Sequence, residues 1–257
     1  MVLERLNKHY LKRHTRRFTG HLTASYTSDY QRQNHTLQRQ KQQSINICTM
    51  NFNIYHRYIK LPFTVAKPKC FAEGLENDFI MYVKPDELPD ELFKWLAQHN
   101  LKISNVIEGF YTKPKGGAIP IHNDTVIPPG QRDACKLNFT WGPDTSTTRW
   151  YKLKTGCEYI EVNHDATEVN KSFQQAGIEP DIDCYKCYSA DEKDIELVHQ
   201  AVINKPSILN VGQLHNTHNP DPTQDRWTLS LTLLKLPGDH LSFEEAIVKF
   251  KDSIEHE

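Results

Sequence analysis

The chain has 257 residues, of which 38% are hydrophobic and 25% charged, and its formal net charge is -1. These values exclude a fibrous or highly charged disordered chain and indicate one large globular domain, or one domain with a tail. Because no apolar run is long enough for a membrane span and no secretory leader is recognisable, we expect a soluble, cytoplasmic protein with no membrane partner.

The first 49 residues differ in charge from the rest. They hold nine Lys or Arg against two acidic residues, whereas residues 50–257 hold 22 basic and 30 acidic ones. Few apolar residues lie between Gln31 and Ser44, which favours a disordered extension, dispensable in front of a true start at Met50. The alternatives are an arm for nucleic acid or a membrane surface, and an Arg-rich targeting segment. We therefore place the folded domain at residues 50–257.

Strand-like runs open this domain at residues 52–61 and 78–83. Carboxylates then precede apolar residues at helical spacing, which predicts a helix from about Pro89 to His99. We expect this helix to pack on the outside of a sheet through Leu92, Trp95 and Leu96.

A further strand is predicted at 103–112, and Thr147–Tyr151 begins another. Between them, residues 134–141 alternate with period two, so that successive side chains lie on opposite faces. In a β-rich domain a polar face of this kind is expected to line a wet cavity rather than solvent. The polar face holds Lys136, Asn138 and Thr140, and the apolar face holds Cys135, Leu137 and Phe139.

Residues 155–206 are polar and are interpreted as an insertion between core strands, with a lid as one role. The amphipathic piece Lys193–Val202 within it is predicted to be helical. Cys184 and Cys187 form a lone C-x-x-C without a second pair for zinc, and six dispersed cysteines in a long chain favour reduced thiols. The chain ends in a helix predicted over Ser242–Ile254.

Residues 208–219 and 226–234 read as a strand, a polar turn and a second strand. In this interpretation His215 ends the first strand, His218 lies in the turn and Arg226 opens the second strand. The residues carry groups that bind metal ions and carboxylates, which makes this stretch the centre of the functional prediction.

His122 and Asp124 stand two residues apart after an apolar run, so in extended backbone both side chains can address one ion. A third ligand from downstream, His215 or His218, would complete two histidines and one carboxylate, the ligand set of non-haem Fe(II) oxygenases. The fork of Arg226, with the Thr228 hydroxyl on the same strand face, is suited to a dicarboxylic cosubstrate.

Together these motifs resemble the Fe(II)/2-oxoglutarate-dependent dioxygenases, nearest to the aspartyl/asparaginyl β-hydroxylase-like group. The resemblance covers about residues 116–234, apart from the insertion. It rests on the following residues: His122-x-Asp124, Asn138, Trp150-Tyr151, Gly212-x-Leu214-His215-x-Thr217-x-Asn219 and Arg226-x-Thr228.

The resemblance implies a mainly β protein with flanking helices, folded as a double-stranded β-helix (a cupin-like jelly roll). It implies that His122, Asp124 and His215 bind Fe(II), and that Arg226 and Thr228 bind 2-oxoglutarate. Asn138 takes a place where the group commonly has a basic residue, and Ser230 shares the strand face of Arg226, so both are candidates for the cosubstrate pocket. O2 is the other cosubstrate.

The implied activity is hydroxylation of a substrate C–H bond, with a protein or peptide side chain or a small metabolite as substrate. Nucleic acid is disfavoured by the acidic body, except through the basic residues 1–49. Two alternatives remain open at this point. One is a jelly-roll binding module without turnover, and the other is a zinc-dependent hydrolase whose metal is held by both His215 and His218.

Overall fold

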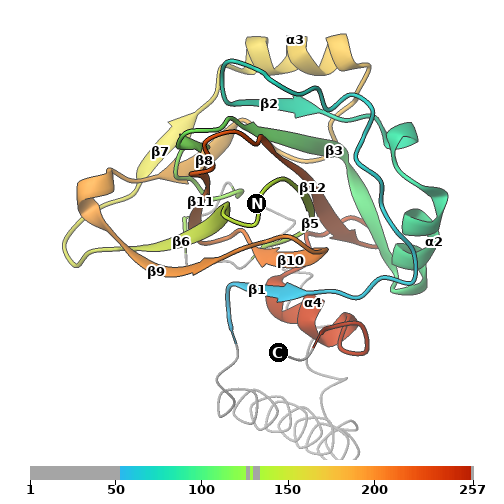
Figure 1. Ribbon diagram of the computed structural model, residues 1–257. Helices are drawn as coiled ribbons and strands as arrows, with labels where there is room; N and C mark the ends of the chain where they lie inside the picture. The colour runs from blue at the N-terminus through green and yellow to red at the C-terminus, as the bar shows by residue number, and fades with distance from the viewer. Residues whose placement is uncertain (1–52, 126–127, 130–133, 256–257) are drawn as a thin grey trace, which may run out of the picture. The chain divides into compact units, whose positions relative to one another are not determined.

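The computed structural model describes residues 53–125, 128–129 and 134–255 (Figure 1). The predictions for residues 1–49 lie outside this range. Within the compact unit that begins at Ile54, the described residues form mainly antiparallel strands with three α-helices, which confirms the mainly β prediction. None of the helices in the described ranges is long and apolar enough to cross a bilayer.

Two larger sheets make up the body. The first has the strand order β1-β10-β5-β12-β3-β2, and the second has the order β4-β11-β6-β9. The strands of the first are β1 (His56–Tyr58), β10 (Ser207–Asn210), β5 (Cys135–Trp141), β12 (Arg226–Lys235), β3 (Leu101–Thr112) and β2 (Phe79–Tyr82). Those of the second are β4 (Gly117–Ala118), β11 (Leu214–Asn219), β6 (Thr147–Leu153) and β9 (Ile195–Ala201).

Four antiparallel pairings are nested along the chain. β3 pairs with β12, β4 with β11, β5 with β10 and β6 with β9. Successive pairs lie alternately in the six-stranded and the four-stranded sheet. The chain therefore passes from one sheet to the other between successive strands of the nest, except from β6 to β9, which pair with each other. The loops that make these crossings bring distant segments together.

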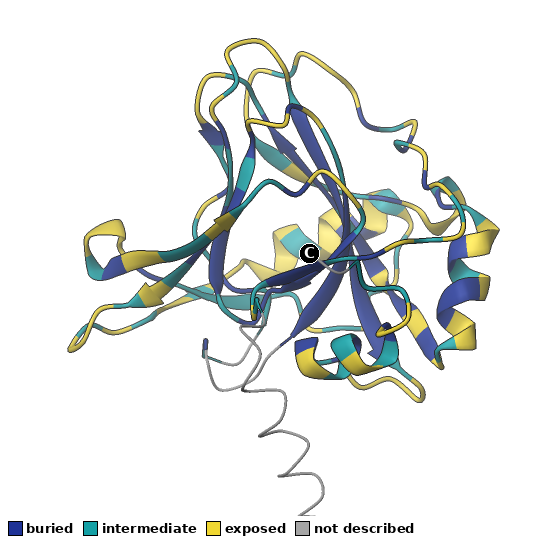
Figure 2. Ribbon diagram, turned by 60° about the horizontal axis from the view of Figure 1, so that its bottom comes forward, coloured by how far each residue is buried: buried dark blue, intermediate teal, exposed yellow. Residues whose placement is uncertain are grey.

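The main hydrophobic core lies on one side of the six-stranded sheet. Figure 2 shows the strands of this sheet largely buried, with exposed residues on the loops and on the outer faces of the helices. The predicted alternation of β5 is confirmed, because Cys135, Leu137 and Phe139 belong to this core. The opposite face of β5 and β12 is polar but buried, and it holds Lys136, Asn138, Arg226, Thr228, Ser230 and Thr232.

Two helices cover the core side. Helix α2 (Asp90–Gln98) matches the prediction and buries Leu92, Trp95 and Leu96. Helix α4 (Phe243–Lys249) begins as predicted, with Ser242 and Glu245 forming a capping box. It ends before the predicted Ile254, because the chain turns there and Ile254 forms a β-bridge with Ile59.

The strand predicted to run from Ile208 to His215 is instead divided between two strands in different sheets. β10 ends at Asn210, and β11 begins at Leu214 after the chain has crossed between the sheets. His215 therefore lies near the start of β11 rather than at the end of a strand. His218 also lies within β11, paired with Ala118, so its predicted place in a turn is wrong.

Residues 155–206 hold two kinds of structure. β7 (Ile160–Asn163) and β8 (Lys186–Ser189) form a two-stranded sheet, with helix α3 (Ala166–Ala176) between them. We call residues 160–189 the arm. The helix predicted over Lys193–Val202 is wrong: β9 occupies this stretch and pairs with the edge of β6. Short apolar runs fit either periodicity, and here pairing to an available edge decides.

His56 makes stability depend on pH. It is 3% exposed, its ring stacks on Trp150, and its Nδ1 atom lies 3.3 Å from Nε2 of His199. Burial, together with the charges of His199 and Arg57, lowers the pKa of His56 from its usual 6.5 to about 4. The stabilising neutral form is therefore fully present above pH 6.5 and is lost as pH falls towards 4.

We expect His56 to contribute about 3 kcal/mol to the loss of unfolding free energy between pH 6.5 and 4. The variant His56→Phe keeps a stacking ring but cannot be protonated, so its unfolding free energy will fall less over that interval. Urea denaturation at pH 7 and pH 4.5 measures the difference. Equal losses in the two proteins would show that His56 is not buried as described.

Candidate metal centre

His122, Asp124 and His215 come together although about ninety residues separate the first two from the third. His122 and His215 form an isolated antiparallel bridge, with N–H to carbonyl distances of 3.0 and 2.8 Å. The backbone N–H of Asp124 donates to the carbonyl of Val211 at 2.9 Å. One ligand atom from each of the three side chains lies within 4.8 Å of the others. These backbone hydrogen bonds join the loop between β4 and β5 to the segment that connects β10 with β11.

Both imidazoles are held by backbone carbonyls on the ring side away from Asp124. Nδ1 of His122 lies 2.7 Å from the carbonyl oxygen of Pro120, and Nδ1 of His215 lies 3.0 Å from that of Gln213. A carbonyl only accepts, so Nδ1 carries a proton in both rings, and Nε2 presents a lone pair whenever the ring is neutral. Metal-binding histidines are commonly oriented in this way.

The two Nε2 atoms face the same carboxylate. Nε2 of His122 lies 2.9 Å from Oδ1 of Asp124, and Nε2 of His215 lies 3.8 Å from Oδ2. Three acceptors directed at one point need a shared cation between them. Either a proton or a metal ion can meet this requirement, and the ligand set is one that suits a divalent transition metal.

The surroundings set the protonation states. Burial would raise the pKa of Asp124, but the charge of Lys136 and the hydrogen bond from His122 hold it well below its usual value. Burial lowers the pKa of His215 to about 4. For His122, burial is outweighed by Asp124, which raises the pKa. At neutral pH Asp124 is therefore ionised and His215 neutral, as metal ligation requires.

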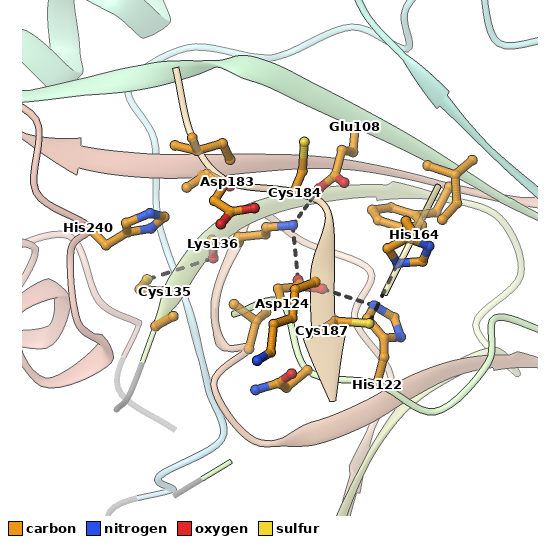
Figure 3. Close-up of a pocket in the computed structure, with 18 residues that line it drawn as sticks. Glu108, His122, Asp124, Cys135, Lys136, His164, Asp183, Cys184, Cys187 and His240 are labelled. Carbon is orange, nitrogen blue, oxygen red and sulfur yellow. Dashed lines mark hydrogen bonds and ion pairs between the residues drawn. The ribbon is translucent and has the colours of Figure 1, made fainter. Parts of the chain in front are cut away.

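Lys136 is a site residue that the sequence prediction placed on the polar face of β5 but did not assign a role. Its Nζ atom lies 3.0 Å from Oδ2 of Asp124 and also makes a close ion pair with Glu108 of β3 (Figure 3). The Lys136 side chain is only 6% exposed. The signal in the sequence is a lysine on a strand face that is expected to line a cavity. The sequence does not identify its partners, because Glu108 and Asp124 come from two other segments.

A small cavity between the two sheets adjoins the ligand cluster. It brings together most of the predicted site residues: His122, Asp124, His215, Asn138, Thr228 and Ser230 line it, together with Thr148 of β6. Ser230 donates to the amide oxygen of Asn138 at 3.0 Å. Asn138 and Ser230 are therefore already bonded to each other.

Arg226 lies behind this cavity rather than in its lining. It is 1% exposed, and Nη2 donates to the hydroxyl of Thr148 at 3.3 Å. Its Nε and Nη1 atoms and the hydroxyl of Thr228 have no hydrogen-bond partner in the described structure. Burial lowers the pKa of Arg226 to about 9. A buried guanidinium without an anion is costly unless a ligand supplies the charge.

A second cavity lies on the other side of the ligand residues. It shares Phe110, His122 and Asp124 with the first, and Lys136 and Glu108 line it (Figure 3). The outer wall comes from the arm, through His164, Ile182, Asp183, Cys184, Lys186 and Cys187. The ligand cluster thus lies between a cavity that the two sheets line and one that the arm borders.

Hydrogen bonds attach the arm to the body at two places. Asn123, which is fully buried between two ligand residues, donates its N–H to the carbonyl of Tyr188 at 2.9 Å and accepts the N–H of Tyr188 on its side chain at 2.8 Å. At the other end, Asp181 accepts from the hydroxyl of Ser104 and the N–H of Asn105. These bonds hold the wall of the cavity in register with the ligands.

Replacing Asn123 with Ala removes the acceptor for the Tyr188 N–H and leaves a part-buried donor unpaired. We expect a loss of about 1–3 kcal/mol of unfolding free energy and faster amide exchange at Tyr188. Hydrogen-exchange mass spectrometry with urea denaturation measures both. Asn163→Ala, an exposed change on β7, is the control. Unchanged exchange at Tyr188 in Asn123→Ala would refute the attachment.

His218 and the cysteines stand apart from the cluster of ligand atoms. Residues three apart in a strand lie on opposite faces, so His218 points away from His215, and the charge of Arg149 adds to burial in lowering its pKa. Sγ of Cys187 lies 3.7 Å from Nε2 of His164. Burial raises the pKa of Cys184 and of Cys187 to about 11, so both are thiols at neutral pH.

Neither a scan against models of protein families nor a search of curated protein sequences finds a match to this chain. Among solved structures, the chain is similar to the crystal structure of EvdO2 from Micromonospora carbonacea var. aurantiaca. The two are 12% identical with a TM-score of 0.31, over 73% of this chain and 81% of that one. At this TM-score the likeness establishes neither a shared fold nor a shared activity.

Proposed function

We propose that this protein is an Fe(II)/2-oxoglutarate-dependent oxygenase that hydroxylates its substrate, as its resemblance to the aspartyl/asparaginyl β-hydroxylase-like group implies. The observation that carries the proposal is the pairing of two features in one small space. Three metal-ligating atoms from distant segments converge, and a buried guanidinium without an anion lies behind the adjoining cavity.

We further propose that the two sheets form a double-stranded β-helix. The nested antiparallel pairs β3·β12, β4·β11, β5·β10 and β6·β9 support this, because a long hairpin that is rolled up places alternate pairs in two facing sheets. β1 and β2 extend one sheet at its two edges. In such a roll the polar face of β5 and β12 faces inwards, which fits the buried polar residues found there.

His122, Asp124 and His215 would hold Fe(II) through two neutral imidazole nitrogens and one carboxylate. When bound with 2-oxoglutarate and O2, the metal supplies chemistry that places one oxygen atom of O2 in a substrate C–H bond and the other in succinate, with release of CO2. The protein's part is to keep the two rings in one tautomer, to keep Asp124 ionised and to leave adjacent coordination positions open.

Arg226 would receive the distal carboxylate of 2-oxoglutarate. Its two unpartnered nitrogens and the free hydroxyl of Thr228 offer three donors to one anion. Thr148, which accepts from Arg226 and lines the cavity, shows that the guanidinium lies directly behind the cavity wall. An anion here would complete the hydrogen bonding that the protein alone leaves unmet.

The substrate would enter through the cavity that the arm borders, since the other cavity is taken by the cosubstrate. Its lining carries charges of both signs, from Glu108, Asp183, Lys136 and Lys186, which fits a polar group such as a protein side chain or a small metabolite. In this assignment the residues of the arm determine substrate specificity.

Anaerobically purified protein should be given Fe(II) and 2-oxoglutarate, exposed to air, and assayed for succinate. We expect slow succinate formation without added substrate, abolished in the variant His122→Ala. Binding of metal and 2-oxoglutarate without succinate would favour a jelly-roll binding module. A metal lost on replacing His218 as well as His215 would favour the zinc hydrolase. Either result would overturn the oxygenase assignment.

A further inference from the structure

We propose that Lys136 is a positioning residue that restricts Asp124 to a single metal bond, and that Glu108 neutralises Lys136 so that it does not repel the metal. The inference rests on the proposed function and adds to it a role for a buried ion-pair chain, Glu108–Lys136–Asp124. These ion pairs connect β3, β5 and the loop after β4 (Figure 3).

The two carboxylate oxygens of Asp124 have different partners. Oδ1 lies 2.9 Å from Nε2 of His122, whereas Oδ2 lies 3.0 Å from Nζ of Lys136 and 3.8 Å from Nε2 of His215. The lysine therefore occupies one oxygen with a charge-assisted hydrogen bond. The other oxygen remains for the metal.

The number of Asp124 oxygens that bind the metal determines how many of its coordination positions stay open. Carboxylates bind metal ions through one oxygen or through both. Two histidines and one carboxylate oxygen leave three positions of an octahedral ion, which suffice for a chelating 2-oxoglutarate and O2. If Asp124 bound through both oxygens, two positions would remain, and the chelating cosubstrate would take both.

The charge of Lys136 is balanced by Glu108. Lys136 is a cation next to a site that must attract a divalent ion. Glu108 forms a close ion pair with the same Nζ atom, so the Lys136–Glu108 pair carries no net charge. Asp124 keeps its negative charge for the metal. Without Glu108, the lysine would both repel the ion and compete with it for Asp124.

The Lys136 side chain is held rigidly by its surroundings. The Lys136 side chain is 6% exposed, its Nζ atom lies 5.9 Å from the centre of the Phe110 ring, and its strand is paired on both sides. The ammonium therefore has a fixed place. A flexible surface lysine could not select one oxygen of a carboxylate.

Three variants separate these roles, with Co(II) as the probe in place of oxygen-sensitive Fe(II). Lys136→Met should bind Co(II) at least as tightly as the parent protein, because a positive charge is gone and Asp124 is free to bind through both oxygens. It should bind 2-oxoglutarate as the parent does, but its Co(II)–2-oxoglutarate form should bind azide, the probe for the O2 position, about 10-fold or more weakly. Glu108→Gln should bind Co(II) about 10-fold more weakly. Lys136→Arg should restore azide binding.

Calorimetric titration of each protein with Co(II), of each Co(II) form with 2-oxoglutarate, and of that complex with azide gives the three affinities, and circular dichroism checks folding. The visible absorption of Co(II) reports its coordination. The inference is overturned if the Co(II)–2-oxoglutarate form of Lys136→Met binds azide as that of the parent does, or if all variants lose all three affinities together. If the parent itself binds no Co(II), the proposed function fails first, which distinguishes the two failures.

Discussion

Replacing Arg226 with Met is expected to make the ligand-free protein more stable while removing its affinity for 2-oxoglutarate. The guanidinium is buried with two unpartnered nitrogens, and burial already lowers its pKa to about 9. An apolar side chain of similar length removes that desolvation cost, so the unfolding free energy should rise by about 1–3 kcal/mol. Because binding loses a buried charge partner, 2-oxoglutarate affinity should fall by about 2–5 kcal/mol.

Thermal melts with and without 2-oxoglutarate test both parts at once. The parent protein loaded with Mn(II) should gain melting temperature when the diacid is added, and Arg226→Met should start higher but gain nothing. Arg149→Met is the matched control, because it changes the next residue of β6 after the cavity-lining Thr148 and so lies on the opposite strand face. A stabilised parent and an equally stabilised Arg226→Met would rule out Arg226 as the anion site.

Replacing Asp124 with Ala is expected to abolish metal binding. Asp124 is the one charged ligand of the cluster, and both imidazoles point at it. The loss of Mn(II) affinity should exceed the roughly 10–100-fold effect of changing a residue that only supports a ligand. Removing Asp124 also leaves the Lys136–Glu108 pair beside the site, which adds no attraction for a cation.

Paramagnetic resonance of free Mn(II) in titrations of the parent and variant measures the affinity. Asp183→Ala is the control, because Asp183 is another carboxylate of the arm-bordered cavity but lies outside the cluster of ligand atoms. Retention of Mn(II) by Asp124→Ala, or an equal loss in Asp183→Ala, would show that the ion binds elsewhere.

The sequence was informative where chemistry and periodicity are local. The spacing of His122 and Asp124 placed both at one point, and the alternation of β5 and the helical spacing of Leu92, Trp95 and Leu96 identified core faces that the structure confirms. These features depend on residues two to four positions apart, which a single segment determines.

What the sequence could not supply depends on pairing between distant segments. The sequence predicts a helix where β9 lies, because only the edge of β6 makes this stretch a strand. It predicts a turn at His218, because the crossing after β10 depends on two separate sheets. Lys136 gained its place in the site from Glu108 and Asp124, which lie 28 and 12 residues away from it in the sequence.

The most direct test is a crystal structure of the protein with Mn(II) and 2-oxoglutarate. We expect one ion bound by Nε2 of His122, Nε2 of His215 and a single oxygen of Asp124, with the diacid chelating the ion and its far carboxylate on Arg226. An ion held by other residues, or a diacid bound away from Arg226, would contradict the assignment.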